Sequence, residues 1–240
     1  QRPEFTQGTY RGQWLSKAEK EGRVGDAIYD ATAPVYTFSD IGDMYSAWLF
    51  VQFIQQQIRH IDFFYDSNGI GLPGYALMLQ ERKYKYGGHF SLPDLWESNR
   101  KSSHTGQYTV EVAEQLGISF EKIELPGKDD QLRAAQDIVN LCHWSEKARE
   151  CYNGLLDWRK RKNEQLSTPD KPVYHDEALK TWGRHVGDAF EGLAVAYRYS
   201  SIGGRVQGSM SNPIPNESHS VKPVSALVRG MPHYSQRRAG

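Results

Sequence analysis

Three runs of apolar residues near the beginning of the chain are separated by short polar connections. They cover residues 35–40, 46–54 and 58–65, and each is rich in β-branched and aromatic side chains. Such side chains favour the pleated backbone of a strand, and Gly, Asp, Asn or Gln at the ends of the runs marks turns. The pattern predicts three consecutive antiparallel strands.

The rest of the chain alternates between helical and strand-like spacing of its apolar residues. A short helix is expected within residues 8–30, and two further strands are expected at 89–93 and 118–125. Longer helical patterns cover residues 75–83, 109–116, 129–142, 145–162 and 176–199. Alternation of this kind is typical of sheets whose faces are covered by crossover helices. We therefore predict an α/β domain with a central mixed sheet and helices on both faces.

The two ends of the chain are predicted to differ from this middle part. Residues 1–33 are assigned to a linker segment, residues 34–200 to the folded domain, and residues 201–240 to a flexible basic tail. Of the last 40 residues, 16 are Gly, Pro or Ser, and five Lys or Arg stand against one Glu. Segments of such composition bury too little apolar surface to fold alone. Because the chain begins with Gln rather than Met, we also expect a longer parent protein.

The overall charge and composition limit the classes of function. Lys and Arg number 29, Asp and Glu also number 29, and the formal net charge is zero. A protein that coats nucleic acid is basic as a whole, so any nucleic-acid contact of this chain must be local. No apolar run approaches the roughly 20 residues that span a bilayer, and no membrane partner is expected. The two cysteines, Cys142 and Cys151, lack CxxC spacing, which disfavours a zinc or disulfide framework.

Three carboxylates stand where side chains of different elements converge in an α/β sheet. Asp40 closes the first predicted strand, Asp94 closes the fourth, and Asp188 lies in the last helix. Converging carboxylates repel one another unless a divalent metal lies between them. Oxygen ligands without Cys favour Mg²⁺ or Mn²⁺, and a pair of such ions catalyses phosphodiester hydrolysis. The structural alternative stays open, because Asp after a strand often forms a turn or caps a helix.

The last predicted helix makes Asp188 the most informative of the three acids. His185, Asp188 and Gly192 run along one flank of this helix. Gly187 and Gly192 each lower helix stability by roughly 1 kcal/mol, and glycines at such positions often allow another group to approach closely. We therefore expect this flank to lie against another part of the domain.

Two basic segments are candidates for contact with a phosphate backbone. The loop after Asp94 contains Arg100 and Lys101, and its polar, basic character suits a phosphate-positioning loop beside a metal site. Residues 159–162 form the densest basic run of the chain. A solvated helix end explains that run at least as well.

Several short segments carry a resemblance to a known family. They are Gly22-Arg23-Val24, Ser39-Asp40-Ile41-Gly42, Gly71-Leu72-Pro73-Gly74-Tyr75-Ala76, Leu92-Pro93-Asp94 and His185-Val186-Gly187-Asp188-Ala189-Phe190. From residue 8 to about residue 199, the chain resembles the C-terminal nuclease domain of tailed-bacteriophage terminase large subunits, which are DNA-packaging proteins. The resemblance implies an RNase H-like fold and a metal-dependent endonuclease that cuts concatemeric double-stranded viral DNA.

The resemblance also implies roles for single residues. By position, Asp40, Asp94 and Asp188 match the acids that hold two Mg²⁺ or Mn²⁺ ions, and Asp43 matches an accessory acid. Two positions depart from the family pattern, because no His precedes Asp94 and because Arg184 stands where a small polar residue is common. The second departure brings a cation beside the metals or the DNA backbone.

The resemblance further implies a set of partners. The chain contains no GxxxxGK[ST] phosphate loop, and in terminase large subunits an ATPase domain precedes the nuclease. The implied partners are double-stranded DNA, an N-terminal ATPase domain in the full-length protein, the portal protein and the small terminase subunit, all in the host cytoplasm. Two alternatives stay open: a junction-resolving or transposase-like nuclease of the same fold, and a non-catalytic module that docks on the packaging machinery.

Overall fold

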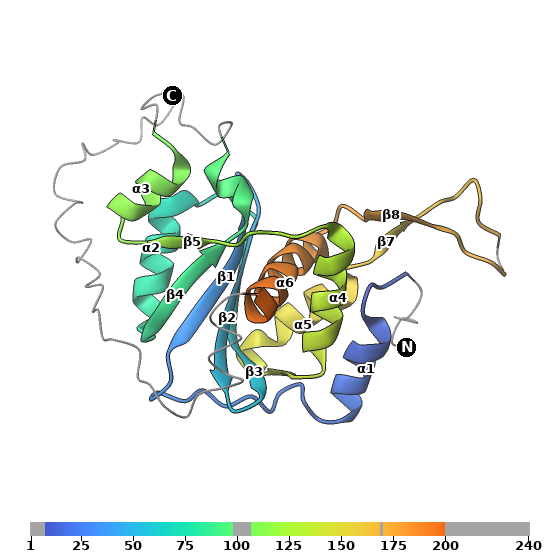
Figure 1. Cartoon of the computed structure of the whole chain (residues 1–240), viewed down its shortest axis with the longest axis horizontal. Helices are drawn as coiled ribbons and strands as arrows, with labels where there is room; N and C mark the ends of the chain where they lie inside the picture. Colours follow the sequence, from blue (N-terminus) through green and yellow to red (C-terminus); the bar gives the residue numbers. More distant parts are fainter. Residues whose placement is uncertain (1–7, 98–106, 169, 200–240) are drawn as a thin grey trace, which may run out of the picture.

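A mixed β-sheet forms the centre of the computed structural model, which describes residues 8–97, 107–168 and 170–199 (Figure 1). Six strands follow one another across this sheet in the order β5-β4-β1-β2-β3-β6. In chain order they are β1 (Val35–Ile41), β2 (Ser46–Ile54), β3 (Gln57–Asp66), β4 (Tyr86–Ser91), β5 (Phe120–Lys122) and β6 (Cys142–Trp144). The first three strands pair antiparallel, as the apolar runs predict.

The pairing of β1 with β4 sets the position of the candidate site. These two strands are parallel, and Ser39 of β1 pairs with Ser91 of β4. Because parallel strands end at the same edge of a sheet, the chain leaves β1 and β4 side by side. In the described part of this sheet, β2 alone runs against the direction of the other strands.

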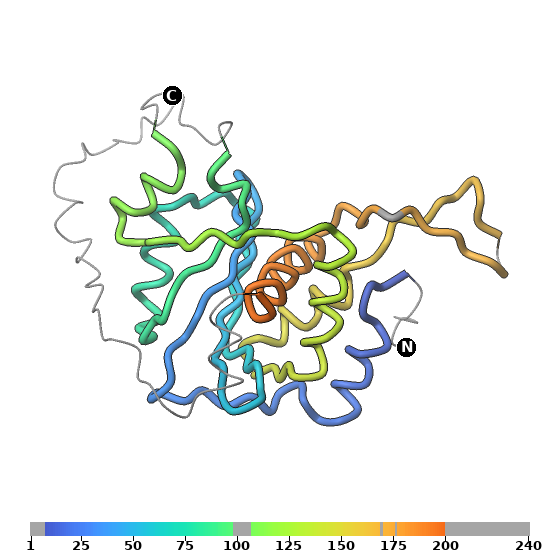
Figure 2. Tube along the Cα trace, viewed as in Figure 1, coloured from blue at the N-terminus to red at the C-terminus, as the bar shows by residue number. Residues whose placement is uncertain are grey.

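Helices cover both faces of the sheet, as predicted (Figure 1). They are α1 (Gly12–Lys20), α2 (Gly71–Arg82), α3 (Thr109–Gln115), α4 (Lys128–Val139), α5 (Arg149–Asp157) and α6 (Trp182–Tyr199), with 3₁₀ turns at η1 (Pro93–Trp96) and η3 (Glu146–Ala148). One face carries α2 and α3, and the other carries α4, α5 and α6. The segment between β5 and α4 carries the chain from the first face to the second (Figure 2).

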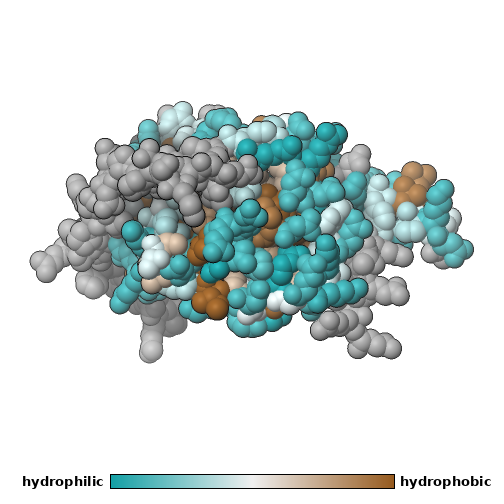
Figure 3. All heavy atoms as spheres, turned by 60° about the horizontal axis from the view of Figure 1, so that its bottom comes forward, coloured by the Kyte–Doolittle hydropathy of each residue, from teal (hydrophilic) through white to brown (hydrophobic). Residues whose placement is uncertain are grey.

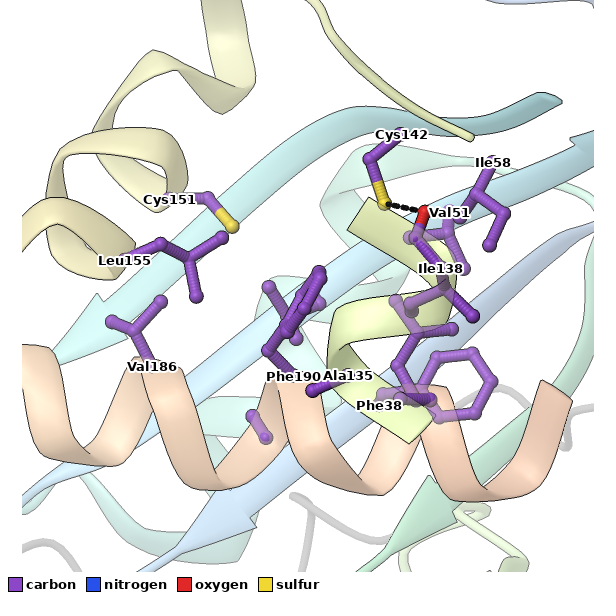
Figure 4. Packing of buried hydrophobic residues seen from close by; sticks show 14 of the residues in the cluster. Phe38, Val51, Ile58, Ala135, Ile138, Cys142, Cys151, Leu155, Val186 and Phe190 are labelled. Atoms are coloured by element: carbon purple, nitrogen blue, oxygen red, sulfur yellow. Dashed lines mark hydrogen bonds between the residues drawn. The ribbon is translucent and has the colours of Figure 1, made fainter. Parts of the chain in front are cut away.

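The alternation of side chains along β2 divides the core into two layers. Leu49 and Val51 point to the α6 face, whereas Trp48 and Phe50 point to the α2 face, because successive side chains of a strand face opposite sides. All four are fully buried, and burial of one such side chain stabilises the fold by roughly 1.5–3 kcal/mol. Figure 4 shows how side chains of the sheet, α4, α5 and α6 interlock in the layer on the α6 face.

Glycines allow α6 to pack very close to its neighbours. A Cβ atom added to Gly187 would lie 2.4 Å from the ring of Trp158. One added to Gly192 would lie 3.0 Å from the side chains of Leu92 and Ile123. The close approach predicted from these two glycines is therefore confirmed, and it brings the polar flank of α6 against the end of β1.

Two predicted helices overlap a small second sheet. The helix predicted over 145–162 ends at Asp157, and the basic run at 159–162 contributes β7 (Lys160–Lys162) instead of a helix end. The physical reason is Trp158, which adopts an extended backbone and buries its ring against α6. β7 pairs antiparallel with β8 (Tyr174–Ala178), so α6 begins at Trp182 and not at residue 176.

The helix predicted over 129–142 is also too long. α4 ends at Val139, and residues 142–144 form β6 at the edge of the sheet, parallel to β3. Trp144 is fully buried there, and its backbone N–H donates to the carbonyl of Arg23. This short strand is stabilised by contacts with a distant part of the chain, which no local period reveals.

Part of the predicted linker segment belongs to the folded core. Leu15 and Ala18 of α1 are fully buried in the layer on the α6 face. The guanidinium of Arg23 donates to two backbone carbonyls at the end of α4 and the start of β6. The domain boundary after residue 33 stays a prediction, and the tail at 201–240 lies outside the described residues.

The described surface is mainly hydrophilic on the side that Figure 3 presents. Large apolar side chains that are mostly exposed, such as Ile28 and Leu166, are scattered along the chain. Single exposed apolar residues are normal for folded proteins. Within the described residues, none of the helices combines the length and the apolar character that crossing a membrane requires.

Candidate functional site

Asp40 at the end of β1 meets His185 of α6. The Asp40 side chain is 12% exposed, and its Oδ2 atom accepts a hydrogen bond of 2.7 Å from His185 Nδ1. This hydrogen bond raises the pKa of His185 above its usual value, although burial of the ring acts in the opposite direction. The pair therefore holds the Asp40 carboxylate at the point where β1 approaches α6.

Asp188 lies one helical turn beyond His185 and adds a second carboxylate. Burial raises the pKa of Asp188, and the negative charge of Asp40 raises it further. The two carboxylates are thus close enough for their charges to repel each other. The structure brings these two predicted site residues together from elements that are far apart in the sequence.

Two cations partly balance the charge of Asp188. Arg184 Nε lies 3.4 Å from Asp188 Oδ2, and Lys128 Nζ, at the start of α4, lies 3.9 Å from Asp188 Oδ1. Both cationic side chains are about half exposed, so each contact contributes only about 0–1 kcal/mol. The pKa of Asp188 still stays above its usual value, because burial and the charge of Asp40 outweigh the two cations.

The reasoning from sequence does not identify two further members of the site, Lys128 and Glu191. The Glu191 side chain is 2% exposed and forms an ion pair with Lys128. Burial raises the pKa of Glu191, and its Oε1 atom has no hydrogen-bond partner among the described residues. Lys128 therefore bridges Glu191 and Asp188. The sequence does contain one sign of Glu191, because it is an acid in the apolar face of the last helix, three residues after Asp188.

Asp94 stands in a 3₁₀ turn and not at the end of a strand. β4 ends at Ser91, and Pro93 opens η1, which contains the half-buried Asp94. The fixed φ of proline is suited to the first residue of such a turn. The strand predicted over 89–93 is therefore wrong at its end. Asp94 follows β4 at the edge of the sheet where β1 also ends, and its role as a third acid stays a prediction.

The remaining predicted site residues are Asp43, Arg184, Arg100 and Lys101. Asp43 is exposed in the turn between β1 and β2, and Arg184 is exposed beside Asp188. Arg100 and Lys101 lie outside the described residues. Metal binding by Asp43 and DNA binding by the three basic residues stay predictions.

The carboxylate pair suits a hard divalent cation. Within residues 8–97, 107–168 and 170–199, no group of three or more His, Cys, Asp or Glu side chains is placed to hold a metal ion. Burial, and then the charge of Asp40, raise the pKa of Asp188, and a hard cation such as Mg²⁺ or Mn²⁺ beside the two carboxylates would favour their ionised form. Asp40 and Asp188 are thus the described residues whose chemistry fits such an ion.

Comparison with known proteins reveals similar folds. No protein-family profile matches the sequence, and no curated protein matches it significantly. The large terminase of a thermophilic bacteriophage in complex with ADP superposes at a TM-score of 0.57, with 11% identity, over 78% of this chain and 45% of that chain. The same protein in complex with ATP-γ-S gives a TM-score of 0.56, with 12% identity, over 75% and 44% of the two chains.

A smaller structure matches over most of its length. The large terminase nuclease domain of bacteriophage SPP1 with bound Mn has 13% identity over 73% of this chain and 94% of that chain, but its TM-score is only 0.48. The chain spans less than half of the large terminase from the thermophilic bacteriophage. At such low identity the likeness establishes the fold alone. The chain therefore shares its fold, an RNase H-like mixed sheet with helices on both faces, with part of a bacteriophage large terminase.

Proposed function

We propose that this chain is the nuclease part of a bacteriophage large terminase and that it cuts concatemeric double-stranded DNA during genome packaging. The observation that carries the proposal is the approach of Asp40 and Asp188 within a fold shared with a large terminase. The resemblance of the segments that contain these two acids supports the same assignment.

The proposed site binds two Mg²⁺ or Mn²⁺ ions. Asp40 and Asp188 would hold them, with Asp94 as the third acid and Asp43 as an accessory one. When bound, such ions activate a water molecule and stabilise the oxygen that leaves the phosphodiester. The carboxylates supply the hard oxygen ligands that these ions prefer.

The neighbouring side chains prepare the carboxylates for this role. His185 holds Asp40 through the hydrogen bond to its Oδ2 atom and leaves the other carboxylate oxygen for a further ligand. Lys128 and Arg184 partly balance the charge of Asp188 and so reduce the repulsion between the carboxylates at the end of β1 and on α6. Both cations are on flexible, half-exposed side chains, which lets them yield the carboxylate to a stronger cation.

We assign the DNA contacts of the basic residues to phosphates, without base-specific readout. Arg100 and Lys101 follow Asp94 in the chain, and Arg184 stands beside Asp188. Phosphate contacts fix the position of a duplex without reading its sequence. Because the net charge of the chain is zero, we expect weak DNA binding that falls with added salt.

The proposed partners follow from the length of the similar protein. The chain covers 45% of the large terminase from the thermophilic bacteriophage, whose structures were obtained with ADP and with ATP-γ-S. We therefore assign an ATPase domain to the same full-length protein. The portal protein and the small terminase subunit, in the host cytoplasm, complete the proposed packaging assembly.

Nicking of supercoiled plasmid DNA in the presence of Mn²⁺ tests the proposal. Asp40→Asn and Asp188→Asn each keep the size of the side chain and remove its charge, and we expect each to lower the nicking rate at least about 100-fold, equivalent to about 2.7 kcal/mol. Asp137→Asn is the matched control, because Asp137 is an exposed acid paired with Arg198. Thermal unfolding of all variants checks that they fold. Equal nicking by the parent and both site variants would refute the assignment.

One observation favours the non-catalytic alternative of a docking module. Asp188 already has two cationic partners, Lys128 and Arg184, and a degenerate site needs no other cation. Titration calorimetry with Mn²⁺ decides between the two functions. We expect heat of binding that Asp188→Asn abolishes, and an absence of binding by the parent chain would favour the docking module.

A further inference from the structure

A cavity of about 580 Å³ lies directly beside the Asp40 and His185 pair. We call it the aromatic pocket, and the lining residues that carry the argument are Tyr45, Tyr65, Lys180, Trp182, Arg184 and His185. They come from the β1–β2 turn, the end of β3, the connection between β8 and α6, and the start of α6. Its volume lies within the range of roughly 300–1,000 Å³ that is usual for pockets that bind small molecules.

Aromatic rings form a continuous series along this pocket. The rings of Tyr45 and His185 are stacked with centroids 5.7 Å apart, and those of Tyr65 and Trp182 meet edge to face at 5.7 Å. Tyr65 and His185 join the two pairs at 6.5 Å. Tyr45 is 47% exposed, so much of its side chain remains accessible to a ligand and is not buried in the core. The pocket thus offers flat apolar surfaces that remain open to a ligand.

The charged side chains that line the aromatic pocket are positive, and the carboxylates of Asp40 and Asp188 lie just outside it, against His185 and Arg184. Lys180 and Arg184 line it, and none of its lining residues is Asp or Glu. Lys180 has no acidic partner among the residues that the structure describes. Positive charge next to exposed rings is the combination by which proteins hold single-stranded nucleic acid, because the rings stack on bases and the cations contact phosphates.

We propose that the aromatic pocket binds one unstacked nucleotide of the DNA strand, next to the phosphate that is cut. The proposal rests on the nuclease function proposed above. A base within a duplex is stacked on both sides and cannot enter a pocket of this size, so the nucleotide must first leave the helix. Any of the four bases suits the pocket, since each has a flat face that stacks on an aromatic ring. Cutting would then follow local opening of the duplex.

A fluorescent DNA tests the pocket without cleavage. The probe is a duplex with one unpaired 2-aminopurine nucleotide, mixed with the full 240-residue chain in EDTA at low salt. We expect binding to quench the probe through stacking and to be about ten-fold tighter than binding to the same duplex without the unpaired nucleotide. Equal affinity for the two duplexes would overturn the proposal.

Substitutions then locate the bound base. Tyr45→Leu and Tyr65→Leu are expected to weaken binding of the unpaired probe about ten-fold and to restore its fluorescence. Tyr199→Leu is the matched control, because this exposed tyrosine lies at the opposite end of α6. Unfolding curves confirm that each variant folds. If both pocket variants bind and quench the probe like the parent, the base lies elsewhere.

Two further arms separate this proposal from its alternatives. Free dAMP carries the same kind of base and phosphate, and we expect millimolar dAMP to leave the DNA probe bound. Displacement at micromolar dAMP would instead assign the pocket to a free nucleotide and overturn the DNA proposal. Asp40→Asn is expected to bind the probe and fail to nick plasmid DNA. A parent chain that nicks DNA but shows no preference for the unpaired probe would refute the pocket alone.

Discussion

The two faces of the central sheet are packed in different ways. On the α6 face, helix backbone and side chain come into direct contact, because Gly187 leaves room for the ring of Trp158. On the α2 face, large side chains such as Trp48 and Tyr75 fill the space between helix and sheet. The close packing of α6 is what brings Asp188 within reach of the end of β1. The close approach of α6 on this face positions the candidate site, whereas the large side chains on the α2 face stabilise the fold.

The buried polar groups of the two faces differ in the same sense. On the α2 face, the Tyr75 hydroxyl donates to Asp66, and the ring of His89 hydrogen-bonds to a threonine hydroxyl. On the α6 face, one polar atom each of His60 and Glu191 has no hydrogen-bond partner among the described residues. Unsatisfied buried groups cost stability and tend to occur near functional sites. Two ionisable side chains on the α6 face, His60 and Glu191, are therefore each buried with one polar atom that is unpaired within the described residues, whereas Tyr75, Asp66 and His89 on the α2 face are hydrogen-bonded.

The largest effect is expected from His60 in acid. Its ring is fully buried between Trp144 and Phe190, and burial lowers its pKa to about 3. In the unfolded chain the pKa returns to about 6.5, so the unfolded state binds more protons below that pH. The contribution of His60 to the free energy of unfolding is complete above pH 6.5 and is lost as the pH falls toward 3. Between pH 6.5 and 4 this loss amounts to about 3 kcal/mol.

His60→Phe isolates this effect, because it keeps an aromatic ring and removes the ionisation. In urea unfolding, we expect the variant to lose about 2.5 kcal/mol less than the parent between pH 7 and pH 4.5. His89 is the counterpart on the α2 face, since burial lowers its pKa to about 4. His89→Phe should reduce the acid loss by a similar amount over this range. Parallel curves for the parent and His60→Phe would show that the His60 ring is accessible to protons.

The next largest effect concerns the close packing of α6. Gly187→Ala inserts a methyl group against the Trp158 ring, and we expect a loss of about 2 kcal/mol in the free energy of unfolding. Gly192→Ala is the matched control, because it lies in the same helix and gains the same helix propensity. Its added methyl group meets only the ends of two flexible side chains, so we expect a change below about 1 kcal/mol. If the two variants lose equal free energy of unfolding, the contact between Gly187 and Trp158 is no tighter than the packing around Gly192.

The long, regular elements of this fold are predictable from sequence, and the short ones are not. β1, β2 and β3 contain 7, 9 and 10 residues, which is enough for the spacing of side chains to identify them. β5, β6 and β7 contain three residues each, too few for a periodic signal. The strand predicted over 118–125 is too long, because β5 covers only Phe120–Lys122. The end of α5 depends on Trp158 and Gly187, which are distant in sequence, so local propensity cannot locate it.

The candidate site shows the same limit. The strand end at Asp40 and the helix flank at Asp188 are visible in the sequence, and the structure brings the two acids together. Lys128 reaches the site from the start of another helix, and no local pattern links it to Glu191. The apolar pattern places Asp94 at a strand end, because the turn that follows β4 depends on the single residue Pro93. Contacts between residues of different helices, such as those of Lys128 with Asp188 and Glu191, therefore cannot be predicted from one sequence.

The smallest effect tests the buried hydrogen bonds of Tyr75 on the α2 face. The Tyr75 hydroxyl donates to Asp66 Oδ2 at 2.8 Å and lies 2.8 Å from the Ser46 hydroxyl, and all three residues are buried. Tyr75→Phe removes one hydrogen bond to a charged group, but Asp66 keeps the backbone N–H donors of Asn68 and Ile70. We therefore expect a loss of about 1.5 kcal/mol in urea unfolding at pH 7.

Tyr84→Phe is the matched comparison for this loss. The Tyr84 hydroxyl is half-buried and donates to Asp62 at 3.2 Å, while Arg82 donates to the same carboxylate oxygen at 2.9 Å. Because solvent and Arg82 compensate for the missing hydroxyl, we expect a loss of about 0.5 kcal/mol. If Tyr75→Phe costs no more than Tyr84→Phe, then the buried hydrogen bond between Tyr75 and Asp66 does not stabilise the α2 face. The contrast with His60 and Glu191 on the α6 face would then have to come from burial of charge alone.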